Sequence, residues 1–432
     1  MKECNIPFCK EIPDTWKEVP NKYLFEYHSV KVGDKWKDYQ LLSLTTSGVK
    51  EKDINASGGK VPDSYDKYQT VEPGDMIFCL FDLDVSAVFS GLSHHYGMIT
   101  SAYDVVRPNH KLLNQNFSDF WFQYVFTNRY YKMYSKNIRF TIGSDMFKAI
   151  ATPIPPMEQQ RKIAGFLNQK TSEIDSLIEI ENQQIEKLKE YKQAVITEAV
   201  TKGLDKNVPL KDSGVEWIGE IPVKWKCIPN KFLFQNGNGS LRIGPFGSSL
   251  RGKTLENGPY KIYNQAHLVS NDFSLNRHFI SNETYEELKS YEVLPDDILF
   301  SMMGTIGKCR IMPSGFQKGI MDSHLLKARL NELILPKYYL YVFDKDMSSC
   351  VISQLRYLSN GSIMDGLNST IIKKVYIPLP SIDDQKKIIS FLDEKCSEID
   401  TLISIKQKKI DDLNEYKKSL IYEYVTGKKE VC

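Results

Sequence analysis

The chain has 432 residues, with 56 Lys+Arg against 54 Asp+Glu and a formal net charge of +2. That length predicts two to four domains, and the apolar fraction of 41% argues against an intrinsically disordered chain. The longest apolar runs (76–81 and 338–343) fall far short of the ~20 residues that a membrane span needs, and residues 1–10 lack the apolar core of a signal peptide. The 8 cysteines form no Cys-x-x-Cys pair, which predicts reduced thiols and no structural metal. Composition therefore predicts a cytoplasmic, multidomain protein.

The first element is a short entrance segment with the pattern Ile-Pro-x-x-Trp, which begins at Ile12 and again at Ile221. Between the first entrance and residue 150, short apolar runs alternate with Gly, Pro, Asn and Asp. The pattern predicts a compact α/β body with one aromatic helix over 119–134.

Basic residues at 3/4 spacing follow in this body, namely Arg129, Lys132, Lys136 and Arg139, interleaved with tyrosines. They are compatible with a helix face that follows DNA phosphates. The interpretation that we favour is an amphipathic helix whose tyrosines pack inward and whose basic residues are solvated.

A long helix is predicted after the prolines at 153–156, because apolar residues recur at 163, 166, 174, 177, 185, 188 and 195. The segment repeats 225 positions later, where Pro-Leu-Pro at 378–380 precedes apolar residues at 388, 391, 399, 402, 410, 413 and 420. A seam of this length needs a partner, and the cheapest partner is the other copy. We therefore predict a tandem pseudo-twofold repeat whose two long helices form an antiparallel coiled coil.

Glu181 and its counterpart Lys406 interrupt the two apolar seams near their midpoints. One hypothesis is that they form an ion pair that helps to determine the register of the helices. The alternative, in which both side chains extend to water, stays open.

The second body, about 230–376, contains a formal Walker A match over 247–254 (Gly-Ser-Ser-Leu-Arg-Gly-Lys-Thr). A phosphate-binding loop needs a preceding strand and a following helix, yet Pro245 interrupts the run before it and Asn-Gly-Pro at 257–259 ends any helix after it. We take this match as coincidental. Arg242, Arg251, Lys253 and Lys261 lie in a Gly/Ser-rich stretch, where either a phosphate-contacting loop or a solvated loop is possible. His94-His95 lacks acidic or Cys partners at ligand spacing, and no catalytic constellation is evident.

The order of these motifs resembles that of the specificity (S) subunits of type I restriction-modification enzymes. The resemblance rests on the Ile-Pro-x-x-Trp entrances, the Gly-Pro-Phe-Gly-Ser-Ser-Leu loop at 244–250, Gly-Thr-Ile-Gly-Lys at 304–308, the linker at 216–222 and the Pro-Leu-Pro segment before a long helix ending in Tyr-Lys. It spans nearly the whole chain and is weakest in the first body.

The resemblance implies an α/β fold with two target recognition domains joined by two spacer helices. The corresponding boundaries are 1–157 for target recognition domain 1, 158–205 for spacer helix 1, 206–377 for target recognition domain 2 and 378–432 for spacer helix 2. Each domain would read one half of a bipartite, asymmetric DNA site. The chain itself would be non-catalytic and bind no cofactor or metal.

The same resemblance implies partners that do the chemistry. Two methyltransferase (M) subunits would dock on the helices and methylate adenine N6 from S-adenosylmethionine after flipping the base. Restriction (R) subunits would contribute ATP- and Mg-dependent translocation and cleavage.

Family analogy also suggests DNA-contacting side chains on loops of each body, since Arg, Asn and Gln can form bidentate contacts to base edges. In the second body the candidates are Arg242, Ser248, Ser249, Arg251, Lys253, Asn264, Gln265, Arg356 and Asn360. In the first body they are Thr45, Thr46, Ser47, Lys50, His95 and Tyr96.

Two functions of other classes compete with this expectation. One is a self-sufficient P-loop ATPase or nuclease that uses 247–254, and replacing Lys253 with alanine separates it from the S-subunit function. The other is a coiled-coil scaffold that never touches DNA.

Overall fold

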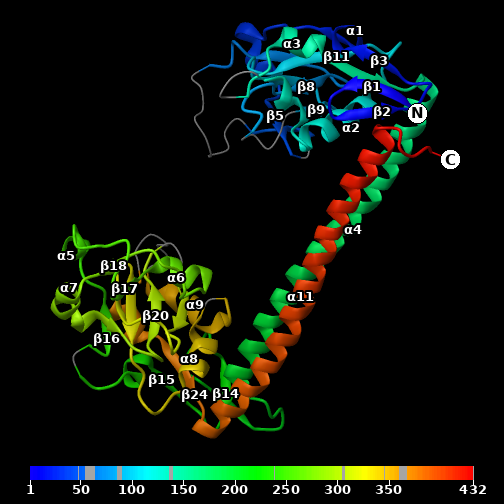
Figure 1. Ribbon diagram of the computed structural model, residues 1–432. Coiled ribbons are helices and arrows are strands. Elements are labelled where there is room, and N and C mark those ends of the chain that lie inside the picture. The colour runs from blue at the N-terminus through cyan, green and yellow to red at the C-terminus, as the bar shows by residue number, and fades with distance from the viewer. Residues whose placement is uncertain are drawn as a thin grey trace. The chain divides into compact units, whose positions relative to one another are not determined.

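The computed structural model describes residues 1–46, 48–53, 64–84, 90–135, 140–237, 239–303, 307–344, 346–359 and 367–431. The chain divides into two compact units, residues 1–181 with 408–432 (unit 1) and residues 182–407 (unit 2). Each unit holds one mixed α/β body together with half of each long helix, as Figure 1 shows. The predicted fold class, two α/β bodies joined by a pair of long helices, is confirmed.

Unit 1 is built on a four-stranded sheet of order β4-β11-β8-β9, with smaller pairs β1-β2, β3-β12, β5-β6 and β7-β10. The strands are β1 (Lys2–Ile6), β2 (Cys9–Ile12), β3 (Lys17–Pro20), β4 (Phe25–Tyr27), β5 (Leu42–Thr45), β6 (Gly48–Glu51), β7 (Gln69–Val71), β8 (Met76–Phe78), β9 (Ser90–Leu92), β10 (Gly97–Ile99), β11 (Asp104–Pro108) and β12 (Ala151–Ile154). The helices are α1 (Asn21–Leu24), η1 (Gly33–Asp38), α2 (Gln115–Thr127), η2 (Tyr130–Tyr134) and α3 (Ser144–Ala149).

Unit 2 has two four-stranded sheets, β16-β23-β20-β21 and β18-β17-β22-β19, and the pairs β13-β14 and β15-β24. The strands are β13 (Leu210–Asp212), β14 (Glu220–Pro222), β15 (Lys226–Pro229), β16 (Leu241–Ile243), β17 (Tyr260–Tyr263), β18 (Phe279–Ile280), β19 (Glu292–Val293), β20 (Ile298–Ser301), β21 (Cys309–Ile311), β22 (Gly319–Met321), β23 (Leu325–Ala328) and β24 (Tyr376–Leu379). The helices are η3 (Asn230–Leu233), α5 (Gly247–Leu250), α6 (Gln265–Ser270), α7 (Asn282–Glu287), η4 (Lys289–Tyr291), α8 (Pro336–Phe343), α9 (Ser349–Leu358) and α10 (Ser369–Lys374).

The two long helices are α4 (Met157–Lys202) and α11 (Ile382–Val425). In unit 1, Lys417 lies 2.7 Å from Asp175 and Lys409 lies 2.6 Å from Glu181. In unit 2, Lys192 lies 2.7 Å from Asp400 and Lys406 donates to Gln184. Because residue numbers rise along one helix as they fall along the other, the helices pack antiparallel in each unit, as predicted. Each helix ends before a glycine with positive φ, which satisfies the last turn without a Cβ clash.

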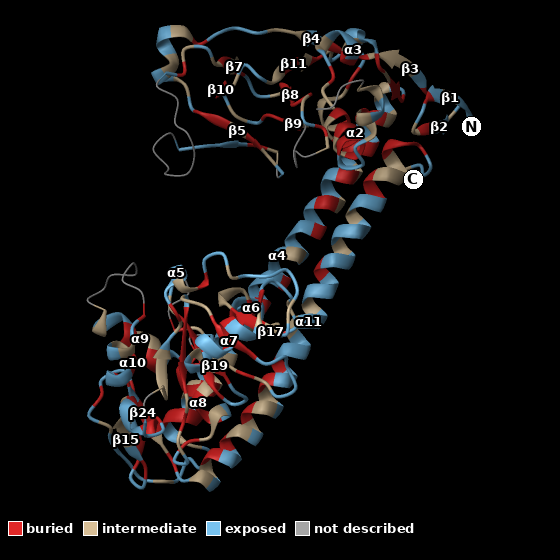
Figure 2. Ribbon diagram, turned by 60° about the vertical axis from the view of Figure 1, so that its left-hand side comes forward, coloured by how far each residue is buried: buried red, intermediate tan, exposed pale blue. Residues whose placement is uncertain are grey.

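The core of each body is aromatic and extends onto the helices. In unit 1, Phe78, Trp121 and Phe122 cluster with Ile163 and Leu167 of α4. In unit 2, the buried rings of α8 and the sheet pack against Ile388 and Leu392 of α11. Figure 2 shows buried residues concentrated on the sheet strands and on the helix faces turned toward them. Docking on a body therefore supplies most of the burial that stabilises each helix end.

The predicted aromatic helix over 119–134 is wrong in its bounds. Helix α2 begins earlier, where the side chain of Asn114 accepts hydrogen bonds from two backbone N–H groups, and it ends at Thr127. Arg129 adopts φ +56° and starts a separate 3-10 turn. The basic residues therefore share no single helix face: Lys132 lies over the ring of Phe140, and positions 136 and 139 lie outside the described residues.

The predicted apolar seam is wrong at Leu177 and Leu402, which are exposed. Regular alternation of four- and three-residue steps takes the seam from Ile174 through position 178 to Glu181. Glu181 is only 5% exposed, so it does not extend to water.

The predicted Glu181–Lys406 ion pair stays a prediction, and each of these residues contacts a polar side chain of the opposite helix. Glu181 Oε1 accepts from Lys409 Nζ at 2.6 Å, and Lys406 Nζ donates to the side chain of Gln184. Both seam-breaking residues thus have a polar partner on the opposite helix.

Candidate nucleic-acid interface

The two bodies repeat one framework of buried polar contacts, although their sequences differ. In unit 1 the buried carboxylate of Asp75 accepts from Arg107 Nε at 3.0 Å and from the backbone N–H three residues earlier. In unit 2 Asp297 accepts from Arg329 Nε at 2.7 Å and from the equivalent N–H. Both pairs connect the same two neighbouring strands of matching four-stranded sheets. The framework therefore fastens the equivalent pair of central strands in each body, β8 with β11 and β20 with β23.

A second repeated contact ties each body to its helix. The side chain of Gln160 accepts from the backbone N–H of Asn114 at 2.7 Å and donates to two carbonyls. Gln385 makes the same three contacts in unit 2, beginning with the N–H of Leu335 at 2.8 Å. Each glutamine is buried in the first turn of a long helix, so it determines how that helix leaves the body.

The candidate residues of the first body lie on two neighbouring loops. Thr45 and Thr46 flank the turn of the β5-β6 hairpin, and Lys50 is on β6. The ring of His95, between β9 and β10, lies 3.2 Å from the carboxylate of Glu51 on the same hairpin. Tyr96 is exposed and stacks on Tyr39. The structure thus brings these residues together, whereas Ser47 lies outside the described residues.

In the second body, the loop that follows β16 carries the candidates Ser248, Ser249 and Arg251 on and just after the one-turn helix α5. Ser248 and Arg251 are exposed. Figures 1 and 2 both show α5 and α6 along the same edge of unit 2. These side chains are available to a ligand that approaches that edge.

Other candidates of the second body already have partners within the protein. Asn264 caps α6 and accepts from the N–H of Ala266 at 3.1 Å, which is a structural contact. Gln265 donates to the carbonyl of Met303, and Arg242 lies over the ring of Tyr291. Arg356 is exposed in the last turn of α9, and Asn360 lies outside the described residues.

The Walker-like stretch does not form a phosphate-binding loop. After α5, Gly252 adopts φ +74° and Leu255 forms an isolated bridge with Phe279, so no helix follows the Lys-Thr pair. The ammonium of Lys253 is held at 2.6 Å by Glu287. Nor do the described residues contain a group of three or more His, Cys, Asp or Glu arranged to hold a metal ion. Neither finding favours the ATPase alternative.

Two lysines of unit 2, Lys261 on β17 and Lys327 on β23, are buried, and sequence reasoning missed Lys327. Burial lowers the pKa of both amines, that of Lys327 to about 8. Lys261 donates to the carbonyl of Phe273 at 2.8 Å, and Lys327 donates to the carbonyl of Glu292. The basic stretch predicts an exposed Lys261, but its place on β17 buries the side chain.

Helices that could cross a membrane are absent from the described part of the chain, since none is both long and apolar enough.

The chain is similar to type I restriction proteins in sequence and fold. Residues 246–415 match the family model described as the type I restriction modification DNA specificity domain. The type I restriction enzyme MjaVIII specificity subunit of Methanocaldococcus jannaschii is 27% identical over 295 residues, which cover 66% of this chain and 64% of that relative. The EcoKI specificity subunit of Escherichia coli K12 is 21% identical over 374 residues, covering 83% of this chain and 75% of that protein.

A solved structure supports the same assignment of fold. A chain from work on complex assembly and conformational transition of the type I R-M system superposes with a TM-score of 0.68 at 13% identity, covering 97% of this chain and 100% of that one. This chain spans less than two thirds of the length of the first relatives that it matches. Residues 246–415 thus match a type I restriction modification DNA specificity domain, and the chain is similar in sequence to type I restriction enzyme specificity subunits and in fold to a chain of a type I R-M system.

Proposed function

We propose that this chain is the DNA sequence-recognition subunit of a type I restriction-modification complex, in which each body reads one half of a bipartite, asymmetric site. The observation that supports it is that both bodies repeat one buried contact, Asp75–Arg107 and Asp297–Arg329, between equivalent strands, whereas the segments that connect their strands differ in length and residues. A shared framework with different connecting segments suits two readers of different half-sites.

The proposal assigns catalysis to other subunits. Methyltransferase subunits would bind S-adenosylmethionine and methylate adenine N6, and restriction subunits would bind ATP and Mg²⁺. This chain would hold DNA and position those subunits, acting in the cytoplasm with the DNA.

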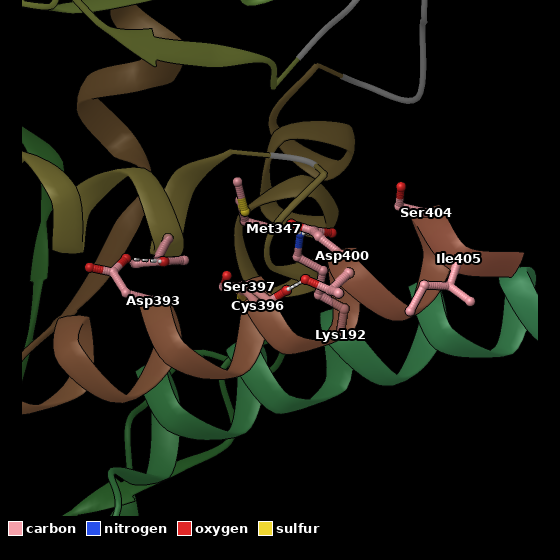
Figure 3. A pocket seen from close by; sticks show the side chains of 10 residues that line it. Lys192, Met347, Asp393, Cys396, Ser397, Asp400, Ser404 and Ile405 are labelled. Atoms are coloured by element: carbon pink, nitrogen blue, oxygen red, sulfur yellow. Dashed lines mark hydrogen bonds and ion pairs between the residues drawn. The ribbon is translucent and has the colours of Figure 1, made fainter. Parts of the chain in front are cut away.

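The helices offer a repeated surface for two copies of one partner. The exposed apolar residues of α4 recur 225 positions later on α11, as Leu177 with Leu402 and Ile180 with Ile405. Each unit thus presents one such apolar pair. In unit 2, Ile405 lines a cavity of about 610 Å³, and Figure 3 shows in the same cavity Asp400 of α11 and the Lys192 side chain that reaches Asp400 from α4. Two equivalent patches support docking of two identical methyltransferase subunits.

Exchange of one body tests the recognition function. Residues 20–150 are replaced by the corresponding segment of another specificity subunit, and N6-methyladenine is mapped genome-wide in cells that carry the cognate methyltransferase subunit. We expect a split motif that depends on the chain, and we expect the exchange to change one half of it. An unchanged motif would support a scaffold that never touches DNA, and the absence of any motif would contradict the proposal.

Charge in the apolar patches tests partner docking. We expect Leu402→Asp with Ile405→Asp to remove one of two bound methyltransferase subunits, and the same changes at 177 and 180 to remove the other. Native mass spectrometry of the complex measures the stoichiometry. Asn182→Asp, at an exposed polar position of α4, is the matched control and should leave both subunits bound. Retention of both subunits in the patch variants would place docking elsewhere.

A further inference from the structure

Phe246 presents an apolar ring to solvent from the loop after β16. Its side chain is 84% exposed, the largest value among the exposed large apolar residues that the structure describes. Its chain neighbours Pro245 and Leu250 are buried, whereas Ser248 and Arg251 are exposed. The ring is therefore largely open to solvent, and the nearest exposed large apolar residue along the chain, Ile243, is only 37% exposed.

The loop that carries this ring is anchored at both ends. The N–H of Gly244 donates to the carbonyl of Leu325 at 2.9 Å, and a Cβ at position 244 would lie 1.7 Å from the carbonyl oxygen of Asp322. At the other end, the carbonyl of Phe246 accepts from the N–H of Ser249 at 2.9 Å, and Leu250 packs in a buried cluster. A ring presented by an anchored loop loses little conformational entropy when a ligand covers it.

The surroundings of the ring favour DNA over protein as its partner. A protein-binding patch is usually a contiguous apolar surface, whereas the exposed residues that follow this ring along the loop are Gly247, Ser248 and Arg251. Arg251 forms no ion pair with any described residue, so its charge is available to a phosphate or a guanine edge. On the major-groove edge of DNA, the apolar group available to a phenyl ring is the C5-methyl of thymine.

We infer that Phe246 is a specificity-determining residue that packs its ring against the C5-methyl group of one thymine in the half-site read by the second body. This inference rests on the proposed recognition function and names the base feature that this loop selects. Because uracil differs from thymine only by that methyl group, replacing thymine with uracil removes the proposed contact and nothing else.

The experiment uses the full chain with its methyltransferase subunits and a DNA duplex that carries the split motif found by methylation mapping. Each thymine of the motif, on both strands, is replaced in turn by deoxyuridine, and binding affinity is measured for the natural chain and for Phe246→Ala. We expect one position at which deoxyuridine weakens binding of the natural chain about four-fold. At that position Phe246→Ala should bind thymine and deoxyuridine duplexes equally.

Phe232→Ala is the matched control, since Phe232 is another phenylalanine of unit 2 and is 56% exposed. It should keep the full response to deoxyuridine. If binding of the natural chain is insensitive to deoxyuridine at every position, the inference is wrong. This part of the experiment uses only the natural chain, so its result does not depend on whether a variant folds. Equal weakening of all duplexes by Phe246→Ala would also overturn it, because it would indicate a ring that inserts between base pairs or supports the loop. Absence of any methylated motif would instead be a failure of the recognition function itself.

Discussion

Lys327 of unit 2 is a single buried amine whose charge costs the fold stability. Lys327, only 3% exposed, lies on β23 with its amine donating to the carbonyl of Glu292. Burial lowers its pKa to about 8; the nearby Asp297 opposes this shift, and Arg329 and Arg242 add to it. The native state therefore holds a cation that water would solvate better, which costs stability as long as the amine stays protonated.

A pH-dependent stability follows from Lys327. Between about pH 7 and about pH 9 the native amine loses its proton before the unfolded one does, so the unfolded state binds more protons and the Lys327 contribution becomes more favourable by about 1 kcal/mol. Urea denaturation measures the unfolding free energies of the natural chain and of Lys327→Met. From about pH 7 to about pH 9 we expect the unfolding free energy of the natural chain to rise by about 1 kcal/mol relative to that of the variant. Lys374→Met, at an exposed position on α10, should show a constant difference. A constant difference for Lys327→Met as well would show that its amine titrates normally.

At the scale of elements, the long helices combine an apolar seam with polar contacts of unequal burial. The Glu181–Lys409 pair places a buried carboxylate in the seam, whereas the Asp175–Lys417 pair lies at its edge with an exposed carboxylate. Charges screened by water contribute little, and a buried carboxylate is costly when its partner is removed.

A double-mutant cycle with Glu181→Gln and Lys409→Gln should therefore give a coupling energy of about 1–2 kcal/mol. The same cycle with Asp175→Asn and Lys417→Gln serves as the control and should give a smaller value. Thermal or urea unfolding of the full chain measures both. Equal coupling in the two cycles would mean that burial of Glu181 does not strengthen its ion pair.

At the scale of the whole molecule, each long helix ends against the entrance of a body. A Cβ at Gly203, after α4, would lie 3.1 Å from the ring of Trp225, and a Cβ at Gly427, after α11, would lie 3.1 Å from the ring of Trp16. In the first case the chain runs on through the hairpin β13-β14 into the second body. In the second case the hairpin β1-β2 at the N-terminus takes the equivalent place, and Met1 and Lys428 line one cavity of unit 1.

This arrangement predicts that the chain tolerates circular permutation. A permutant with residues 432 and 1 joined by a short Gly/Ser linker, and opened between Asp205 and Lys206 in the exposed connection, should fold and direct methylation to the same motif. Circular dichroism and methylation mapping check the two parts of the prediction. An opening within β17 is the control and should prevent folding, because it breaks a buried strand. A misfolded permutant would show that the natural connection at 203–222 is needed for assembly.

Local patterns were sufficient for the repeated entrances, the long helices and their antiparallel pairing, because a 3/4 apolar period and a tandem copy are read along the chain. The same patterns misplaced Leu177 and Leu402, since only packing shows which apolar residues of a helix face its partner. They also missed the equivalence of Arg107 with Arg329, which a comparison at 222 positions would have found. The entrances repeat after 209 positions and the long helices after 225. Insertions between these segments give the bodies their own offset of 222, so the match is easily overlooked.

The amino-acid order therefore established the tandem architecture and the resemblance to S subunits, both of which depend on residues close together in the chain. Tertiary structure decided which basic residues are surface groups. Lys261 and Lys253 are eight positions apart in one basic stretch, yet the first is buried on a central strand and the second forms an exposed ion pair. It also singled out Phe246, whose exposure depends on where the sheet and the loop anchors place its backbone. Burial is a property of neighbours from distant parts of the chain, and no pattern of adjacent residues contains it.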